Sequence, residues 1–283
     1  MVNEHDENRP AGNRTIKTPR QLDSVSAWIE KARQEHLASA EVAGGPTLPR
    51  FANCGAHGVY PLYDIDDRGV TRWHSDGCPT CRTQRRVEQL MSRAAIPERH
   101  AGCNFDNFVV LHDGQKRALA IARQYAEQFA SHRKSGASLL FLGNQGTGKN
   151  HLSAAIGKAI LTQGFSVLHA TAFEVTGKIK ATWSKRDGES QRTQPEVIND
   201  FASVDLLILD EVGRGVSPRV DAPLLFSVID QRYQQCRPTL VISNFGLDVV
   251  EQWLTPPGLD RLREGGGDCV RFDWRSVRGC VIS

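Results

Sequence analysis

Long apolar runs are missing from this sequence, and none approaches the roughly 18 residues that a membrane-spanning helix needs. Residues 1–20 are polar throughout and contain no hydrophobic stretch of the kind found in signal peptides. We therefore expect no membrane partner and a cytoplasmic protein. A large net charge is missing too, because the formal value is only +3, so any nucleic-acid-binding surface has to be local.

The composition is that of an ordinary folded protein, with 40% hydrophobic and 24% charged residues, so a core can be buried. The 283 residues leave room for one α/β domain of about 170 to 200 residues and a smaller unit. We predict three parts: an arm and helix at 1–50, a cysteine-rich module and connector at 51–102, and the main domain at 103–283. Within the first part, apolar residues recur at helical spacing from Pro19 to Glu41, which predicts an amphipathic helix.

Cysteine is sparse and its number, seven, is odd, which favours metal ligands or buried thiols over disulfides in a chain without an export signal. Cys54-x-x-His57 and Cys78-x-x-Cys81 supply four ligands in two close pairs, which suits tetrahedral Zn²⁺. His74 is an alternative to His57. A redox dithiol at Cys78 and Cys81 is another interpretation, but no thioredoxin-like strand precedes that pair, so zinc is favoured.

Three arginines follow the second cysteine pair directly. Arg82, Arg85 and Arg86, with aromatic residues of the same module, are suited to hold single-stranded DNA through phosphate contacts and base stacking. A solvated helix face explains the same residues equally well, and both interpretations stay open.

Short apolar runs alternate with helical stretches in the main domain. Strands separated by helices imply βαβ units and a parallel sheet covered on both faces, so the expected fold class is α/β. Helices are also expected at Val87–Ala94 and at Gly114–Lys134. The predicted strands are 139–142, 166–170, 204–209 and 239–243, and the first two flank a predicted helix at 149–162.

A glycine-rich segment between the first predicted strand and this helix matches G-x-x-x-x-G-K-[ST] at every specified position but the last. Its glycines let backbone N–H groups turn toward phosphate oxygens, and the helix N-terminus adds partial positive charge. A glycine-rich turn with a chance lysine is the simpler explanation, but the flanking strand and helix argue against it. The predicted ATP-binding residues are Gly143, Asn144, Gln145, Gly146, Thr147, Gly148, Lys149 and Asn150.

Lys149 is expected to reach the β- and γ-phosphates of ATP. Asn150 is a departure, because Ser or Thr at this position gives a hydroxyl to Mg²⁺, whereas asparagine offers an amide oxygen or a hydrogen bond to a water of the ion. We expect nucleotide binding to survive this change.

The strand at 204–209 ends in two carboxylates, and such acid-bearing strands sit beside the phosphate loop. Asp210 is expected to hold Mg²⁺, directly or through water, and Glu211 to polarise the attacking water. Asn244 follows the strand at 239–243, where an asparagine of AAA+-type P-loop ATPases hydrogen-bonds the γ-phosphate or that water. Without the phosphate loop, a solvated turn explains each of these residues.

The segments GTGKNHLSAAIGKAI, DLLILDEVG, TLVISN, LDRLRE and FDWRSVR resemble the DnaC family of replicative helicase loaders, which are AAA+ ATPases. The resemblance covers about residues 103–283, and Gly-Lys-Asn-His is itself a feature of that family. It implies that Arg261 is the arginine finger, which reaches the ATP of a neighbouring subunit, and that Arg278 is the sensor II arginine. A planar guanidinium suits the charge that spreads over the γ-oxygens.

The resemblance implies a loader that holds a hexameric helicase, binds single-stranded DNA and uses ATP as a release switch. Hydrolysis is expected to be slow and to rise when subunits assemble through AAA+ interfaces on a partner. Related DnaI-type loaders carry a zinc-bearing N-terminal domain, so the helix and zinc module are expected to grip the helicase. The alternatives are an IstB-type transposase accessory ATPase and a small-molecule P-loop kinase.

Overall fold

The computed structural model describes residues 51–65, 71–74, 77–184 and 192–276. The chain forms two compact units, residues 1–75 and residues 76–283, which we describe separately. The helix predicted at Pro19–Glu41 and the sensor residue Arg278 lie outside the described residues. In the part of the chain that the structure describes, no helix is long and apolar enough to cross a membrane.

The described part of the first unit consists of two antiparallel hairpins. The first hairpin pairs Phe51 with Pro61 and Cys54 with Gly58, and its turn ends at Gly58, whose φ of 74° favours glycine. These short strands were not predicted from the sequence. Their bounds are β1 (Phe51–Cys54), β2 (Gly58–Pro61), β3 (Tyr63–Ile65) and β4 (Thr71–Trp73).

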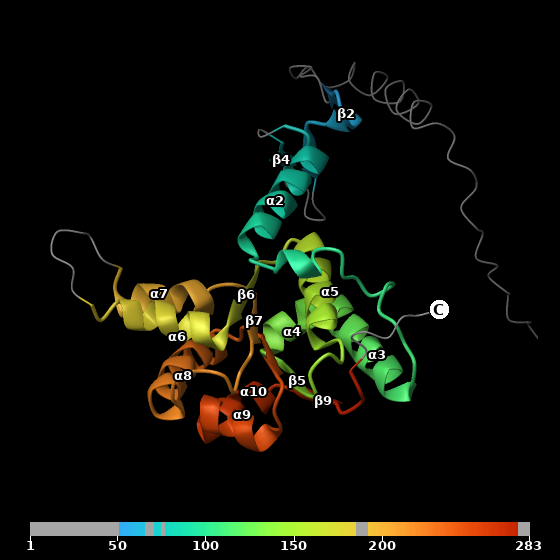
Figure 1. The fold of residues 1–283 in the computed structure, drawn as a ribbon. Helices are drawn as coiled ribbons and strands as arrows, with labels where there is room; N and C mark the ends of the chain where they lie inside the picture. The colour runs from blue at the N-terminus through green and yellow to red at the C-terminus, as the bar shows by residue number, and fades with distance from the viewer. Residues whose placement is uncertain (1–50, 66–70, 75–76, 185–191, 277–283) are drawn as a thin grey trace, which may run out of the picture. The chain divides into compact units, whose positions relative to one another are not determined.

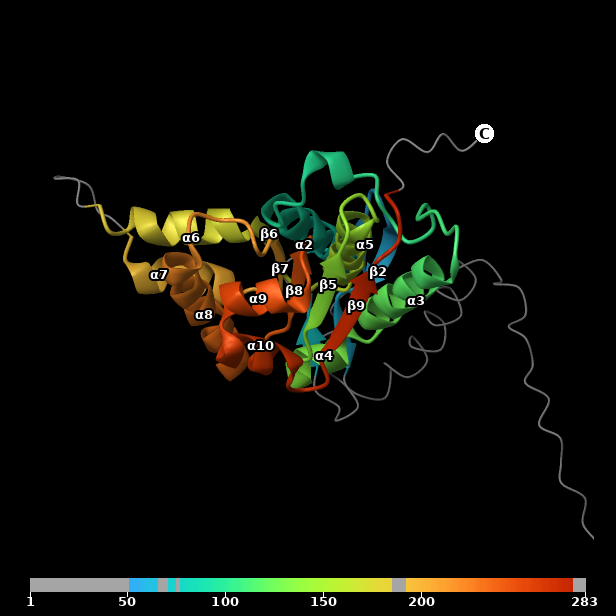
Figure 2. The same cartoon turned by 60° about the horizontal axis from the view of Figure 1, so that its bottom comes forward.

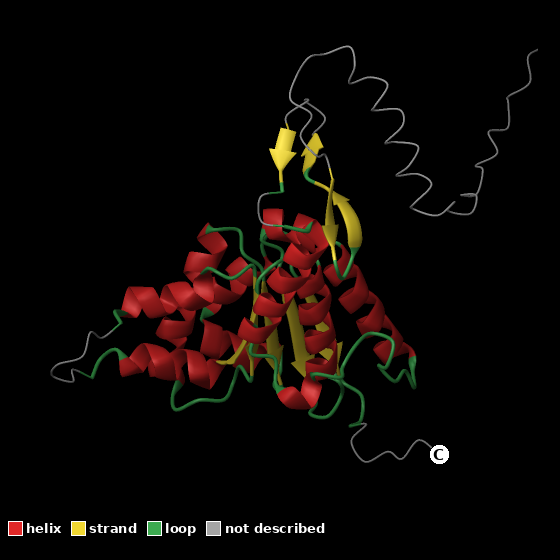
Figure 3. Ribbon diagram, turned by 90° about the horizontal axis from the view of Figure 1, so that it is seen from above, coloured by secondary structure: helices red, strands yellow, loops and turns green. Residues whose placement is uncertain are grey.

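The second unit is built on a five-stranded sheet in which all neighbouring strands run parallel. Figure 3 shows these strands between layers of helices. This arrangement confirms the predicted α/β fold class with a parallel sheet between helices. The strands are β5 (Leu139–Gly143), β6 (Val167–Thr171), β7 (Leu206–Asp210), β8 (Thr239–Ser243) and β9 (Asp268–Phe272), in the spatial order β6-β7-β8-β5-β9.

The order of the strands shows where the acid-bearing strand lies relative to the strand that leads into the phosphate loop. The acid-bearing strand β7 does not lie beside β5, which leads into the phosphate loop, because β8 is inserted between them and pairs with both. Adjacency in the sheet is decided by the crossover connections, and local apolar patterns do not reveal these. Since all five strands are parallel, their carboxyl ends still meet at one edge of the sheet, where ligands bind in open α/β folds.

Helices alternate with these strands, as Figure 1 shows. The helix expected at 114–134 is broken in two at Gln128, whose φ of −92° and ψ of 11° leave the helical range. The helix expected at 87–94 starts earlier, since Pro79 begins it. The helices are α2 (Pro79–Arg93), the 3-10 turn η1 (Glu98–His100), α3 (Asp113–Glu127), α4 (Phe129–Ser135), α5 (Lys149–Thr162), α6 (Ala172–Ala181), α7 (Gln194–Ala202), α8 (Pro218–Gln234), α9 (Leu247–Leu254) and α10 (Pro256–Arg263).

The sheet is buried on both faces because side chains of successive residues point to opposite sides of a strand. On β5, Leu140 and Leu142 pack into the core formed with α6 to α10. Leu139 and Phe141 of the same strand pack into the second core, with α3, α4 and α5. Figure 2 shows the two groups of helices on either side of the strands. Burial on both sides explains why the strands appear in the sequence as continuous apolar runs.

A buried arginine on α8 forms hydrogen bonds to residues at and just before the amino ends of β7 and β8. Arg232 donates from Nε to Oγ1 of Thr239 at 2.9 Å and from its Nη atoms to the carbonyls of Phe201, Val204 and Pro238. Burial lowers the pKa of Arg232 to about 9, so the guanidinium remains charged at neutral pH. The carbonyl groups surround this charge, which is how a buried cation is tolerated.

Candidate nucleotide site and metal centre

The phosphate loop follows β5 and depends on glycine at three positions. Gly143, Gly146 and Gly148 have φ values of 123°, 73° and 95°, which favour glycine. A Cβ atom at Gly143 would lie 2.5 Å from the carbonyl oxygen of Phe272, and one at Gly148 would lie 2.6 Å from the ring of Phe108. The loop is therefore a tight backbone cradle of the kind that binds phosphate.

Lys149 is the first residue of α5 and is only 3% exposed. Its Nζ donates to the carbonyl oxygens of Gly143 at 2.8 Å and of Asn144 at 2.6 Å. Among the described residues, no side chain caps the start of this helix, so its N-terminal partial charge faces the loop. The cradle, the ammonium and the helix terminus together fit the polyphosphate of ATP.

The end of β9 and the residues directly after it hold the phosphate loop in place through hydrogen bonds. The backbone N–H of Asn144 donates to Phe272 O at 2.8 Å, and its side-chain amide donates to Asp273 O at 3.1 Å. The indole N–H of Trp274, a residue only 8% exposed, donates to Thr147 O at 3.0 Å. Sequence reasoning assigned no role to Trp274 or Phe108, and only the quoted segment FDWRSVR pointed to this region.

Asp210 ends β7 and is 5% exposed. The side-chain amide of Asn150 donates to its Oδ2 at 2.7 Å, and the backbone N–H of Glu211 donates to its Oδ1 at 2.7 Å. Nε2 of His169, on β6, lies 3.5 Å from the same Oδ2. The structure thus brings Asn150 and Asp210 together, and it adds a histidine that the sequence did not indicate.

Glu211 follows Asp210 with a φ of 55°, which is an uncommon backbone conformation for a residue other than glycine. Strained residues of this kind cluster at functional sites. Its side chain is 42% exposed, and Arg214 Nη1 lies 3.3 Å from its Oε1. The next residue, Val212, donates to Ile242 O at 3.0 Å, which joins this turn to β8 two residues before Asn244. Carboxylate and amide therefore follow adjacent strands at the same edge of the sheet.

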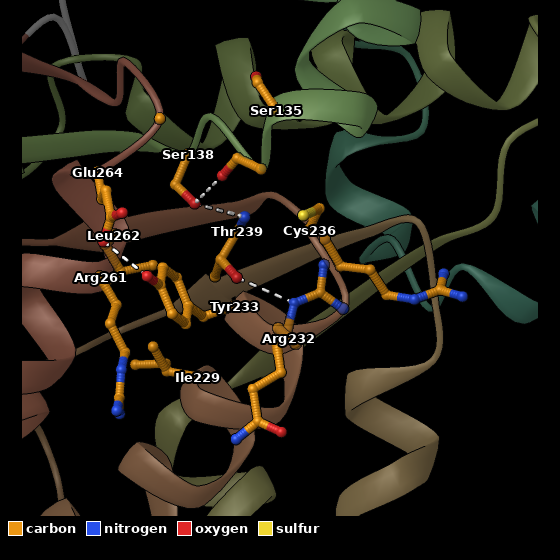
Figure 4. A pocket seen from close by; sticks show the side chains of 14 residues that line it. Ser135, Ser138, Ile229, Arg232, Tyr233, Cys236, Thr239, Arg261, Leu262 and Glu264 are labelled. Carbon is orange, nitrogen blue, oxygen red and sulfur yellow. Dashed lines mark hydrogen bonds between the residues drawn. The ribbon is translucent and has the colours of Figure 1, made fainter.

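Arg261 lies elsewhere on the domain. Its Nη1 is 2.7 Å from Oδ1 of Asp230, and its guanidinium packs 4.7 Å from the ring centroid of Phe226 and 5.4 Å from that of Tyr233. It lines a pocket of about 300 Å³ with Arg232, Ser138 and Thr239, at the amino ends of β5 and β8 (Figure 4). The phosphate loop follows the carboxyl end of β5, so the structure does not bring Arg261 to the phosphate loop of its own chain.

The predicted zinc ligands form a group of converging atoms. Cys78 immediately precedes α2 and Cys81 lies in its first turn, while Cys54 Sγ lies 3.7 Å from Nδ1 of His57. The ligand atoms of these four residues all lie within 4.8 Å of one another. Tetrahedral zinc with Zn–S bonds of about 2.3 Å needs ligand atoms about 3.8 Å apart, so three thiols and one imidazole fit the ion. The group includes His57 and not His74.

A glycine cradle lies between a buried strand and a helix, and carboxylates follow another parallel strand of the same sheet. These features define an ATP-binding protein of the P-loop class. Comparison with known proteins supplies the family. Residues 76–262 match the family described as IstB-like ATP binding protein, and the chain belongs to that family.

The chain is similar to proteins described as replicative helicase loader DnaC. It is 34% identical to those of Escherichia coli and of Buchnera aphidicola subsp. Acyrthosiphon pisum, in each case over 196 residues. These residues cover 69% of this chain and 77% of either relative. Among solved structures, the fold resembles a DnaC helicase loader with a TM-score of 0.53, 20% identity and coverage of 62% of this chain and 99% of that one. It also resembles DnaI, with a TM-score of 0.51, 18% identity and coverage of 64% and 94%.

Proposed function

We propose that this protein loads a replicative hexameric helicase onto single-stranded DNA during the initiation of replication, with ATP as the switch for release. The observation that carries the proposal is the 34% identity to replicative helicase loaders over 196 residues. The names of these relatives favour a loader over a transposase subunit or a small-molecule kinase. Because the relatives are bacterial replication proteins, we place the activity in the cytoplasm.

We propose a role in ATP binding or hydrolysis for each residue of the nucleotide site. Backbone N–H groups of residues 143–150 and the ammonium of Lys149 bind the phosphates, and Lys149 exchanges its two carbonyl partners for phosphate oxygens. Asp210 and Asn150 hold Mg²⁺, directly or through its water shell. Magnesium-bound ATP supplies a γ-phosphoryl group whose charge the ion partly neutralises. Glu211 orients the attacking water, and Asn244 hydrogen-bonds the γ-phosphate or that water.

The site is incomplete within one chain, which leads us to propose assembly. Arg261 lies at the opposite end of the sheet from the phosphate loop, so it can complete only the ATP site of a neighbouring subunit. Arg278 is proposed as the sensor II arginine of the bound nucleotide. Hydrolysis by the isolated chain is then slow, and it rises when subunits assemble on single-stranded DNA or on the helicase.

We assign the N-terminal part to partner binding. Zinc bound by Cys54, His57, Cys78 and Cys81 supplies the folding energy that such a small module needs. The zinc module at 51–102 and residues 1–50 bind the helicase, whereas residues 103–283 form the ATPase domain. On α2 the side chains of Arg82, Arg85 and Arg86 are exposed, which leaves them accessible to DNA phosphates.

The test is association of the purified full-length chain with a hexameric replicative helicase, measured by size-exclusion chromatography with light scattering. A complex that forms with ATP and dissociates after hydrolysis supports the proposal. A chain that ignores the helicase but binds duplex DNA together with an integrase would contradict it and favour the transposase subunit.

A further inference from the structure

Sheet geometry places one histidine next to the carboxylate assigned to magnesium. In the parallel pair β6–β7, His169 is in register with Ile208, and Thr171 with Asp210. Because side chains alternate along a strand, Ile208 and Asp210 share one face of the sheet. His169 lies on that face too, diagonally across from Asp210, and is only 8% exposed. An imidazole is long enough to span such a diagonal pair.

The carboxylate of Asp210 is held at both oxygens. Oδ1 accepts the backbone N–H of Glu211 at 2.7 Å, so the turn itself fixes this atom. Oδ2 accepts the amide of Asn150 at 2.7 Å and has Nε2 of His169 at 3.5 Å. Three groups from three different elements therefore surround one buried carboxylate.

The backbone of His169 is anchored independently of its side chain. β6 is one of the two edge strands of the five-stranded sheet, and on its outer side the N–H of His169 donates to Ala94 O at 2.8 Å. Ala94 is fully buried at the end of α2, so this bond fixes the position from which the imidazole extends. Because the backbone of His169 is already fixed, less conformational entropy is lost when its side chain packs against Asp210.

Such an arrangement has a consequence for magnesium because Asn150 replaces the hydroxyl that binds the ion in other phosphate loops. Asp210 then carries a larger share of the coordination, and the orientation of its carboxylate matters more. Groups that orient a ligating carboxylate change metal affinity even though they do not touch the metal.

We propose that His169 is a positioning residue of the magnesium site, which holds Oδ2 of Asp210 in the orientation that the ion needs. The inference rests on the proposed role of Asp210. His169 contacts neither nucleotide nor ion, and it acts through the carboxylate.

The experiment measures equilibrium binding of a fluorescent ATP analogue over a range of MgCl₂ concentrations and in EDTA. Mg²⁺ raises the affinity for the ATP analogue, and the midpoint is the Mg²⁺ concentration that gives half of this increase. In His169→Leu the midpoint rises by about tenfold, which is the smallest loss of metal affinity usually seen when an outer-shell partner is removed. Affinity in EDTA stays at the parent value. His169→Gln restores most of the loss because its side-chain amide again places a polar N–H group beside Oδ2. His132→Leu, which changes a histidine stacked on Tyr125 far along the chain from this site, behaves like the parent.

An unchanged Mg²⁺ midpoint in His169→Leu, or an equal loss of affinity with and without Mg²⁺, overturns the inference, because His169 then only fills space. A parent protein whose ATP affinity does not respond to Mg²⁺ overturns it as well, together with the role of Asp210. None of these outcomes depends on helicase association, which is measured separately, so failure of the loader proposal is distinguishable.

Discussion

The side-chain amide of Asn150 donates to Oδ2 of Asp210 over 2.7 Å, which joins the first turn of α5 to the end of β7 across the intervening strand β8. The residue that departs from the usual phosphate-loop motif is thus paired with the carboxylate assigned to magnesium. We propose that this contact orients the acid, since asparagine has no hydroxyl to give to the ion.

Replacing Asn150 by aspartate tests this pairing with almost no change of shape. Asn150→Asp puts a second carboxylate within hydrogen-bonding distance of Asp210 and beside the phosphates. Repulsion should weaken binding of Mg²⁺-ATP by about tenfold or more. Isothermal titration calorimetry measures the loss, and Asn150→Ala, which removes the donor without adding charge, should lose less. Equal losses in the two variants would contradict the electrostatic explanation.

Removing the ammonium of Lys149 should abolish ATP binding, because it is the main cationic contact to the terminal phosphates. The matched control is Lys158→Ala on the same helix, since Nζ of Lys158 donates to Ala101 O at 2.7 Å, away from the loop. A fluorescent ATP analogue should bind the control and the parent alike. If Lys149→Ala retains the parent affinity, the glycine loop is not the nucleotide site.

The cysteine cluster should bind about one zinc ion per chain, as elemental analysis of freshly purified, reduced protein measures. Cys78→Ser should lower that content and make residues 51–86 sensitive to protease, because structural zinc contributes folding energy directly. Cys236→Ser, at an exposed thiol outside the cluster, should keep the metal. If the freshly purified, reduced parent protein contains no zinc, the assignment of a zinc site is wrong.

Arg261 should matter for hydrolysis only between subunits. Arg261→Ala is expected to bind ATP normally but to lose the rate stimulated by DNA and helicase, measured as phosphate release. Mixing it with Glu211→Gln should restore activity, since each variant supplies the half-site that the other lacks. Arg263→Ala, on the same helix and exposed, serves as the control. Parent-like stimulated activity in Arg261→Ala would show that this arginine only pairs with Asp230.

The parts of the fold that sequence reasoning predicted are those with a local signal. The helix at 149–162 and the strand at 239–243 were predicted with the bounds that the structure shows. Strands buried on both faces leave unbroken apolar runs, and the glycine loop has a fixed spacing, so neither requires knowledge of distant contacts. The phosphate-loop residues and Asp210 could be proposed for the same reason.

The parts that were missed depend on contacts between distant segments. Strand β9 lies at an edge and has exposed residues at three of its five positions, so it leaves no apolar run. The break at Gln128 interrupts a pattern that continues helically on both sides. His169 joins the site only through the pairing of β6 with β7, and no spacing in the sequence connects it with Asp210. The insertion of β8 between β5 and β7 likewise follows from topology alone.

The central claim, that this protein uses ATP to load a helicase, is tested most directly with covalently closed circles of single-stranded DNA. A hexameric helicase cannot thread onto a circle from an end, so its retention on circles after gel filtration measures loading. We predict that the parent protein and Lys158→Ala raise retention in the presence of ATP, and that Lys149→Ala does not. Retention that is the same with and without the parent protein would contradict the account.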